Sequence, residues 1–259
     1  MMKFLSQLFS PSPEQFSAVF AEHKVVLVDY QTSDLVEIER QTLALAETLG
    51  AVIQYEEDPF SGQMTSNHWT EIKYDPNGPN AYKTSNTYQP LHTDYGYFHQ
   101  EMPVSFFYCV EQADFGGATT FFDPNQLVAM MESEYPTLLK EIQETKIHFG
   151  RNDSAFTSRT DFILQKQANA WKVNWNYYRA KDDLQNIELI ERFKAFLDKY
   201  VEKSGELTEL KLSRGQAVFF QDGYVLHGRN SFLGNRQLNK GAISSVSLEE
   251  LKAIYMSLK

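Results

Sequence analysis

The chain has 259 residues, a formal net charge of −10 and a pI of about 5.1. This acidic balance argues against nonspecific binding to nucleic acid and against docking on an anionic membrane, because both attract cationic proteins. The only cysteine, Cys109, has no partner for a disulfide within the chain, so we expect it to be a buried packing residue in a protein of the reducing cytoplasm.

The amino-terminal third combines predicted strands, one capped helix and a long polar segment. Residues 1–13 have neither the apolar core nor the cleavage site of a signal peptide, and no segment approaches the length of a membrane span. Residues 59–86 are rich in Asn, Gly, Pro, Ser and Thr, so we expect a loop from about 56 to 90 that acts as a lid. The elements expected before it are a strand at 24–30, a helix from Ser33 or Asp34 to about 49, and a strand at 51–55.

The rest of the chain alternates short apolar strands with helices, and nothing in it marks a linker or a repeat. We therefore expect residues 1–259 to form a single domain. The strands are expected at 102–109, between 116 and 123, at 172–178 and between 213 and 223, and the helices at 124–145, 182–203 and 248–258. Counting these elements alone predicts a mixed α and β protein.

His92-Thr93-Asp94 and the distant His227 supply two imidazoles and one carboxylate. Side chains at positions i and i+2 of an extended strand point to the same side, so His92 and Asp94 can both reach one ion while Thr93 faces away. Two His and one carboxylate on one face of a metal leave its other positions open, which is the ligand arrangement of non-haem Fe(II) oxygenases. Alone this signal is weak, since a single His is more often a structural residue than a ligand.

Further motifs follow in a fixed order. Gly116-Gly117-Ala118-Thr119 precedes a predicted strand, His227 is part of His227-Gly228-Arg229, and Arg236 comes after it. From about residue 91 to 243 the chain resembles the taurine dioxygenase and TfdA-like family of Fe(II)/2-oxoglutarate-dependent oxygenases, which includes the γ-butyrobetaine hydroxylase branch and carries these motifs in this order. The resemblance implies a mainly β fold with flanking helices around a double-stranded β-helix, a relative of the jelly roll.

Carried over by position, the resemblance implies that His92, Asp94 and His227 are the iron ligands. It also implies that Thr119 and Arg236 bind a carboxylate of 2-oxoglutarate. A planar guanidinium suits this task, because it can bind a carboxylate through two parallel hydrogen bonds.

The chain departs from taurine dioxygenase-like members at one position of this motif. Four residues after Arg236 those proteins carry a second Arg, and this chain carries Lys240. We expect Arg236 to be the main anchor for 2-oxoglutarate. Lys240 either shares that binding or is a solvated surface charge, and both interpretations stay open at this point.

The activity that the resemblance implies is hydroxylation of an unactivated C–H bond. Fe(II) would be the metal, 2-oxoglutarate and O2 the co-substrates, and succinate and CO2 the by-products. Desaturation or cyclisation with the same cofactors stays open, as does a jelly-roll binding protein without catalysis. A zinc hydrolase could use the same two His and Asp, but it would leave Thr119 and Arg236 without a role.

Substrate contacts are expected just after the iron motif and ahead of the helix at 182–203. The candidates there are Tyr95, Tyr97, Asn176 and Arg179. Arg179 could hold a substrate carboxylate or form a surface ion pair, and His68, Trp69 and Tyr82 of the expected lid could close over the substrate. These polar, aromatic and basic groups favour a small polar substrate, such as a free amino acid or a derivative.

Overall fold

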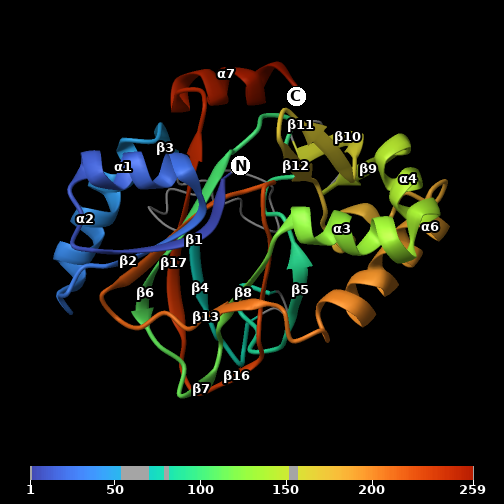
Figure 1. Ribbon diagram of the computed structural model, residues 1–259. Coiled ribbons are helices and arrows are strands. Elements are labelled where there is room, and N and C mark those ends of the chain that lie inside the picture. The colour runs from blue at the N-terminus through green and yellow to red at the C-terminus, as the bar shows by residue number, and fades with distance from the viewer. Residues whose placement is uncertain (1, 54–69, 79–81, 152–156, 259) are drawn as a thin grey trace.

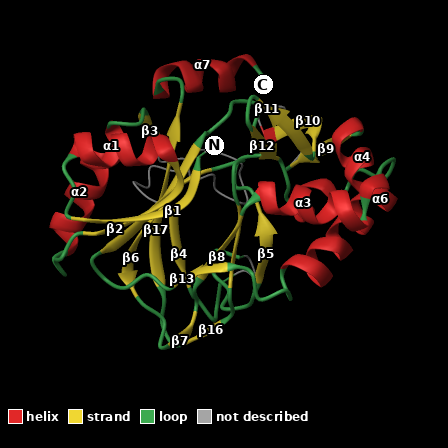
Figure 2. Cartoon of the chain, viewed as in Figure 1, coloured by secondary structure: helices red, strands yellow, loops and turns green. Residues whose placement is uncertain are grey.

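Two β-sheets form the centre of the computed structural model, which describes residues 2–53, 70–78, 82–151 and 157–258 (Figure 1, Figure 2). The larger sheet runs in the order β1-β2-β14-β6-β17-β3, and β4 also pairs with β17. Its strands are β1 (Lys3–Phe9), β2 (His23–Asp29), β3 (Ala51–Ile53), β4 (Thr70–Lys73), β6 (Val104–Glu111), β14 (Gln216–Gln221) and β17 (Gln237–Ser244). The smaller sheet runs in the order β13-β8-β15-β5, with strands β5 (Gln89–His92), β8 (Thr119–Phe122), β13 (Thr208–Leu210) and β15 (Leu226–Arg229).

Short strand pairs and helices surround these sheets. The pairs are β7 (Phe115–Gly116) with β16 (Phe232–Leu233), β9 (Lys146–Gly150) with β10 (Ser158–Phe162), and β11 (Leu164–Gln167) with β12 (Ala170–Val173). The helices are α1 (Pro13–Glu22), α2 (Leu35–Glu47), α3 (Pro124–Glu134), α4 (Pro136–Glu144), α5 (Tyr177–Ala180), α6 (Ile187–Phe196) with its π-helical continuation η2 (Leu197–Val201), and α7 (Leu248–Ser257). Among the described residues, no helix is both long enough and apolar enough to cross a membrane.

Strand β6 shows how alternate side chains connect the layers. Phe106 and Tyr108 pack on one face of the larger sheet, against residues of α1 and α2. Phe107 and Cys109 belong to the opposite face, where they share a core with Phe121 of the smaller sheet. Because successive side chains of a strand lie on opposite faces, a strand buried on both faces needs an unbroken apolar run. Each large apolar side chain buried in this way stabilises the fold by roughly 1.5–3 kcal/mol.

Helices α3, α4 and α6 cover the side of the molecule opposite to α1 and α2 (Figure 1). Trp175 is buried in this region, with its ring in edge-on contact with Phe193 of α6 at 4.7 Å between centroids. Lys24 of β2 is fully buried and forms an ion pair with the partly buried Asp123, at 2.6 Å between Nζ and Oδ1. Asp123 also accepts the N–H of Asn125 and thereby caps α3. These contacts attach the helical flank to the sheets.

The observed arrangement confirms a mainly β fold with flanking helices, built as a double-stranded β-helix. The helix expected at 124–145 is two helices, because Pro136 cannot continue the hydrogen-bond pattern of α3 and Tyr135 before it leaves helical geometry. The strand expected at 172–178 ends at Val173, and α5 begins soon afterwards.

The segment expected to be one long loop, about 56–90, contains regular structure. Strand β4 lies within it and pairs with β17, and β5 begins before its end. Residues 54–69 and 79–81, which include His68 and Trp69, lie outside the described residues. The expectation of one continuous loop was therefore wrong.

Candidate metal centre and its pocket

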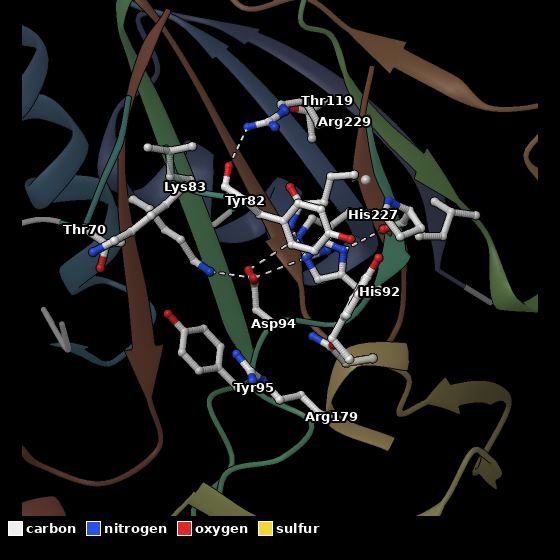
Figure 3. Close-up of a pocket in the computed structure, with 18 of the residues that line it drawn as sticks. Thr70, Tyr82, Lys83, His92, Asp94, Tyr95, Thr119, Arg179, His227 and Arg229 are labelled. Carbon is white, nitrogen blue, oxygen red and sulfur yellow. Dashed lines mark hydrogen bonds and ion pairs between the residues drawn. The ribbon is translucent and has the colours of Figure 1, made fainter. Parts of the chain in front are cut away.

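Two neighbouring strands of the smaller sheet bring the predicted imidazoles together. His92 ends β5, His227 lies on β15, and the two are register partners. Asp94 lies just beyond β5, while Thr93 turns away and donates to the carbonyl of Trp175 at 3.2 Å. One ring nitrogen of each His and one oxygen of Asp94 lie within 4.8 Å of one another, and Figure 3 shows the Asp94 carboxylate turned toward both rings. Asp94 oxygens lie 3.7 Å from His92 Nε2 and 3.5 Å from His227 Nε2, and two ligand atoms that are each about 2 Å from a shared ion are at most about 4 Å apart.

Backbone contacts orient the imidazole of His92. Its Nδ1 lies 2.9 Å from the carbonyl oxygen of Pro90, so this nitrogen carries the proton and donates. Its Nε2 accepts a hydrogen bond from the side-chain amide of Gln89 at 3.1 Å and lies 3.7 Å from Asp94 Oδ1. Metal-binding His residues commonly donate their other ring N–H to a carbonyl, because this fixes the tautomer and the ring orientation. The orientation of His92 therefore suits a metal ligand.

The charges in the cluster suit a divalent cation. Burial by itself disfavours the ionised form of Asp94, but Lys240 and His227 nearby hold the pKa of Asp94 well below its usual range. Burial, together with the neighbouring His92, lowers the pKa of His227 to about 4. At neutral pH the carboxylate is thus ionised and the His227 imidazole neutral, which are the protonation states that bind metal.

Lys240 is largely removed from solvent beside the cluster, so its interpretation as a solvated surface charge was wrong. Its side chain is 13% exposed, and its Nζ lies 2.6 Å from Asp94 Oδ1. The hydroxyl of Ser105 donates to the other carboxylate oxygen of Asp94 at 3.0 Å. The ammonium of Lys240 also lies 4.9 Å from the centre of the Tyr95 ring. Lys240 and Ser105 therefore hold one oxygen of Asp94 each.

Thr119 and Arg236 line the same cavity as the cluster and are only 4% and 5% exposed. Thr119 begins β8, next to the strand that carries His227. Arg236 Nε donates to the carbonyl of Gly117 at 3.1 Å. Gly117 has a φ of +75°, and a Cβ there would lie only 3.1 Å from Arg236 Cδ, so a glycine is needed for this close approach. Burial lowers the pKa of Arg236 to about 10, which leaves it cationic at neutral pH.

A cavity of about 400 Å³ contains the cluster on its wall, a size typical of small-molecule sites. All the substrate candidates line it, namely Tyr95, Tyr97, Asn176 and Arg179. Arg229 also lines the cavity, but its guanidinium donates to the backbone carbonyls of Tyr82, Ser85 and Thr87. Arg229 therefore fixes the segment that precedes β5.

Asp222 is a residue of this site that sequence reasoning missed. One oxygen of its carboxylate accepts the backbone N–H of Asp94 and the other that of Tyr95, each at 3.0 Å. Burial and the nearby Asp94 raise the pKa of Asp222 to about 6. In the sequence, Asp222 followed by Gly223 signals only a turn, and nothing local indicates which N–H groups its carboxylate accepts.

The profile of the family described as "Taurine catabolism dioxygenase TauD, TfdA family" matches residues 4–242. The chain belongs to this family. The TauD, TfdA match covers nearly all of both sheets and every residue of the cluster, and it confirms the resemblance seen in the sequence. The protein is therefore a non-haem dioxygenase that uses Fe(II), 2-oxoglutarate and O2, rather than a zinc hydrolase or a binding protein. None of the curated proteins matches this sequence.

Solved structures with low sequence identity share the fold of this TauD, TfdA family member. The non-heme iron oxygenase OrfP in complex with Fe and alpha-ketoglutaric acid is 14% identical, with a TM-score of 0.65 over 88% of this chain and 77% of its own. Asparagine oxygenase in complex with Fe(II), 2S,3S-3-hydroxyasparagine and succinate is 9% identical, with a TM-score of 0.71 over 93% and 81%. A taurine dioxygenase from Burkholderia xenovorans is 12% identical, with a TM-score of 0.62 over 93% and 86%.

Proposed function

We propose that His92, Asp94 and His227 hold the Fe(II) of this dioxygenase, and that the site hydroxylates a C–H bond of a small polar substrate. The observation that carries this proposal is the convergence of two imidazole nitrogens and one carboxylate oxygen within 4.8 Å on the wall of a cavity. Three ligands on one face of an ion leave its remaining positions for co-substrates. The lowered pKa values of Asp94 and His227 support the same assignment, since both groups are ready to bind a cation.

Thr119 and Arg236 are proposed to bind a carboxylate of 2-oxoglutarate. The carbonyl of Gly117 engages the Nε of Arg236, and no hydrogen bond from its two terminal nitrogens is found among the described residues, so these nitrogens can bind a carboxylate. The hydroxyl of Thr119 can donate a further hydrogen bond. Lys240 is the weaker candidate for this role, because its ammonium already pairs with Asp94.

Iron, 2-oxoglutarate and O2 together supply the oxidation of an unactivated C–H bond, with succinate and CO2 as by-products. The residues of the chain supply placement, which is where a protein contributes most to such chemistry. Lys240 and Ser105 fix the carboxylate of Asp94, and the carbonyl of Pro90 fixes the ring of His92. Desaturation or cyclisation would need the same contacts, so the outcome depends on how the substrate is held.

The substrate is inferred to be a small polar molecule such as an amino acid or a derivative. The volume of the cavity and its lining by Tyr95, Tyr97, Asn176 and Arg179 support this inference. Two of the similar structures hold molecules of this kind, since asparagine oxygenase contains 3-hydroxyasparagine and OrfP contains (3S)-hydroxy-L-Arg.

Turnover of 2-oxoglutarate tests the proposal. Protein reconstituted with Fe(II) in air is expected to convert 2-oxoglutarate to succinate slowly alone and faster with an accepted member of a panel of amino acids and N-acyl derivatives. His92→Ala and Asp94→Ala are expected to abolish turnover while circular dichroism shows an unchanged fold. Full activity in either variant would overturn the ligand assignment.

A further inference from the structure

The cavity beside the metal cluster is cationic, although the protein as a whole has a net charge of −10. Among the described residues that line it, Asp94 is the only carboxylate. The basic side chains that line it are Lys83, Arg151, Arg179, Arg229, Arg236 and Lys240. A pocket lined by one sign of charge with low-dielectric walls raises the local concentration of the opposite ion. The dianion 2-oxoglutarate accounts for part of this charge.

Most of these basic side chains are already engaged. Lys240 pairs with a carboxylate of the cluster, and Arg229 donates to backbone carbonyls. Arg236 is the proposed anchor of 2-oxoglutarate. Lys83 and Arg151 also have interaction partners within the protein. These five side chains therefore offer little capacity for a second anion.

Arg179 of α5 is placed differently. Its Nε is buried, and in the part of the chain that the structure describes this Nε has no hydrogen-bond acceptor and no carboxylate forms an ion pair with the guanidinium. The guanidinium carbon lies 4.9 Å from the centre of the Tyr97 ring, a contact that restricts the side chain. A buried donor without an acceptor is unfavourable, because it loses its hydrogen bond to water and gains none in the protein. Arg179 is thus positioned for an acceptor that enters the cavity.

The position of Arg179 separates it from the residues proposed for 2-oxoglutarate. Figure 3 shows Arg179 and Tyr95 on one side of the Asp94 carboxylate, and Thr119 with Arg229 on the other. The cavity therefore has two places for an anion, with the metal cluster between them. A molecule held by Arg179 would extend its carbon chain toward the cluster from the side opposite to Thr119.

We propose that Arg179 binds a carboxylate of the substrate, and that the substrate is consequently a small organic acid. This inference deepens the proposed function and rests on it. Two parallel hydrogen bonds from a guanidinium orient a carboxylate as well as bind it, so Arg179 also determines which C–H bond faces the metal. A free amino acid or an N-acyl amino acid meets this requirement through its carboxylate, whereas a carboxamide or an amine does not.

Matched acids and carboxamides test the proposal. Protein loaded with Fe(II) and 2-oxoglutarate without O2 is titrated with N-acetylglycine, N-acetylleucine and 4-methylpentanoate, and with the carboxamide of each, while its visible absorption is followed. The acids are expected to give half of the spectral change at concentrations at least about tenfold lower than the amides do. An amide lacks the charge-assisted hydrogen bonds that a carboxylate would form with Arg179, and the loss of such a pair implies a difference of this size.

Variants identify the residue responsible. In Arg179→Gln the acids are expected to bind as weakly as the amides, and Arg179→Lys is expected to retain part of the preference because it keeps the charge without the planar fork. Arg192→Gln is the matched control, since Arg192 lies on α6 outside the cavity lining and pairs with Glu141 at 2.8 Å. This control is expected to prefer acids as the wild type does.

The proposal is overturned if acids and amides change the spectrum at the same concentrations, or if neither changes it. It is also overturned if Arg179→Gln still binds the acids more tightly than the amides. Absence of the iron–2-oxoglutarate absorption band before any acid is added would instead overturn the proposed function. In that case, calorimetric titration of the same acids and amides into the metal-free wild-type and Arg179→Gln proteins still decides whether Arg179 binds a carboxylate.

Discussion

The carboxylate of Asp222 holds the backbone of Asp94, because its Oδ1 accepts the Asp94 N–H at 3.0 Å while its Oδ2 accepts the N–H of Tyr95 at the same distance. Asp222 follows β14 and precedes the strand that carries His227, whereas Asp94 follows β5. One carboxylate therefore connects the two segments that deliver the proposed iron ligands.

Removal of the Asp222 carboxylate is expected to weaken metal binding. Asp222→Ala should lower the affinity for Co(II) by roughly 10- to 100-fold, the usual effect of losing a group that orients a ligand, and Asp222→Asn by less because one acceptor oxygen remains. Titration of the metal-free protein with Co(II) measures this change. Asp183→Asn is the matched control, since Asp183 also accepts backbone N–H groups but lies outside the cavity lining. An unchanged Co(II) affinity in Asp222→Ala would contradict the prediction.

Arg236→Ala is expected to raise the KM for 2-oxoglutarate by roughly 10- to 100-fold, because a charged hydrogen-bond pair contributes about 1.5–3 kcal/mol. Lys240→Met should change this KM much less, since the Lys240 ammonium is paired with Asp94. Steady-state kinetics at saturating Fe(II) compares the two variants. The opposite ranking would transfer the anchoring of 2-oxoglutarate from Arg236 to Lys240.

Lys24→Ala is expected to lower the free energy of unfolding by roughly 3–5 kcal/mol, because it leaves Asp123 without its buried partner. The double variant Lys24→Met with Asp123→Asn removes both charges and should recover part of this loss. Urea unfolding followed by circular dichroism measures both effects. A loss below about 1 kcal/mol in Lys24→Ala would place this pair with the weak ion pairs of protein surfaces.

Cys109 is expected to be unreactive in the folded protein. It is fully buried, and burial raises the pKa of its thiol to about 11. A disulfide reagent is attacked by the thiolate, so at pH 8 the native protein should react at least about a hundredfold more slowly than the protein unfolded in urea. The absorbance of the released thiol gives both rates. Rapid, stoichiometric labelling of the native protein would contradict the buried position.

Local patterns in the sequence predicted much of the fold. The apolar run around Phe106 predicted a strand, which in the structure is buried on both faces. Ser33 or Asp34 was expected to start the helix now seen as α2, and Asp34 is the residue whose side chain accepts the N–H of Val36. The spacing of His92 and Asp94 predicted that both could reach one ion, and the structure brings them together with His227. Their role as ligands remains a prediction, as do the single-domain organisation and the cytoplasmic location.

Other features depend on contacts between distant parts of the chain and have no local signal. Strand β4 is a strand because it pairs with β17, and its own four residues alternate too briefly to be recognised. The burial of Lys240 follows from its partner Asp94, which the segment just after β5 supplies. The role of Asp222 likewise depends on N–H groups from a distant loop. In each case the structure or function of the residue depends on a residue that is distant in the sequence, and a single sequence does not show which residue that is.

The central claim is that one site holds both Fe(II) and 2-oxoglutarate, and the most direct test is to add both to the metal-free protein without O2 and record its visible absorption. Our assignment predicts a weak charge-transfer band in the wild-type protein, no band in His92→Ala, and a band in Arg236→Ala only at higher 2-oxoglutarate concentrations. A folded wild-type protein that binds Fe(II) but shows no band at any 2-oxoglutarate concentration would contradict it.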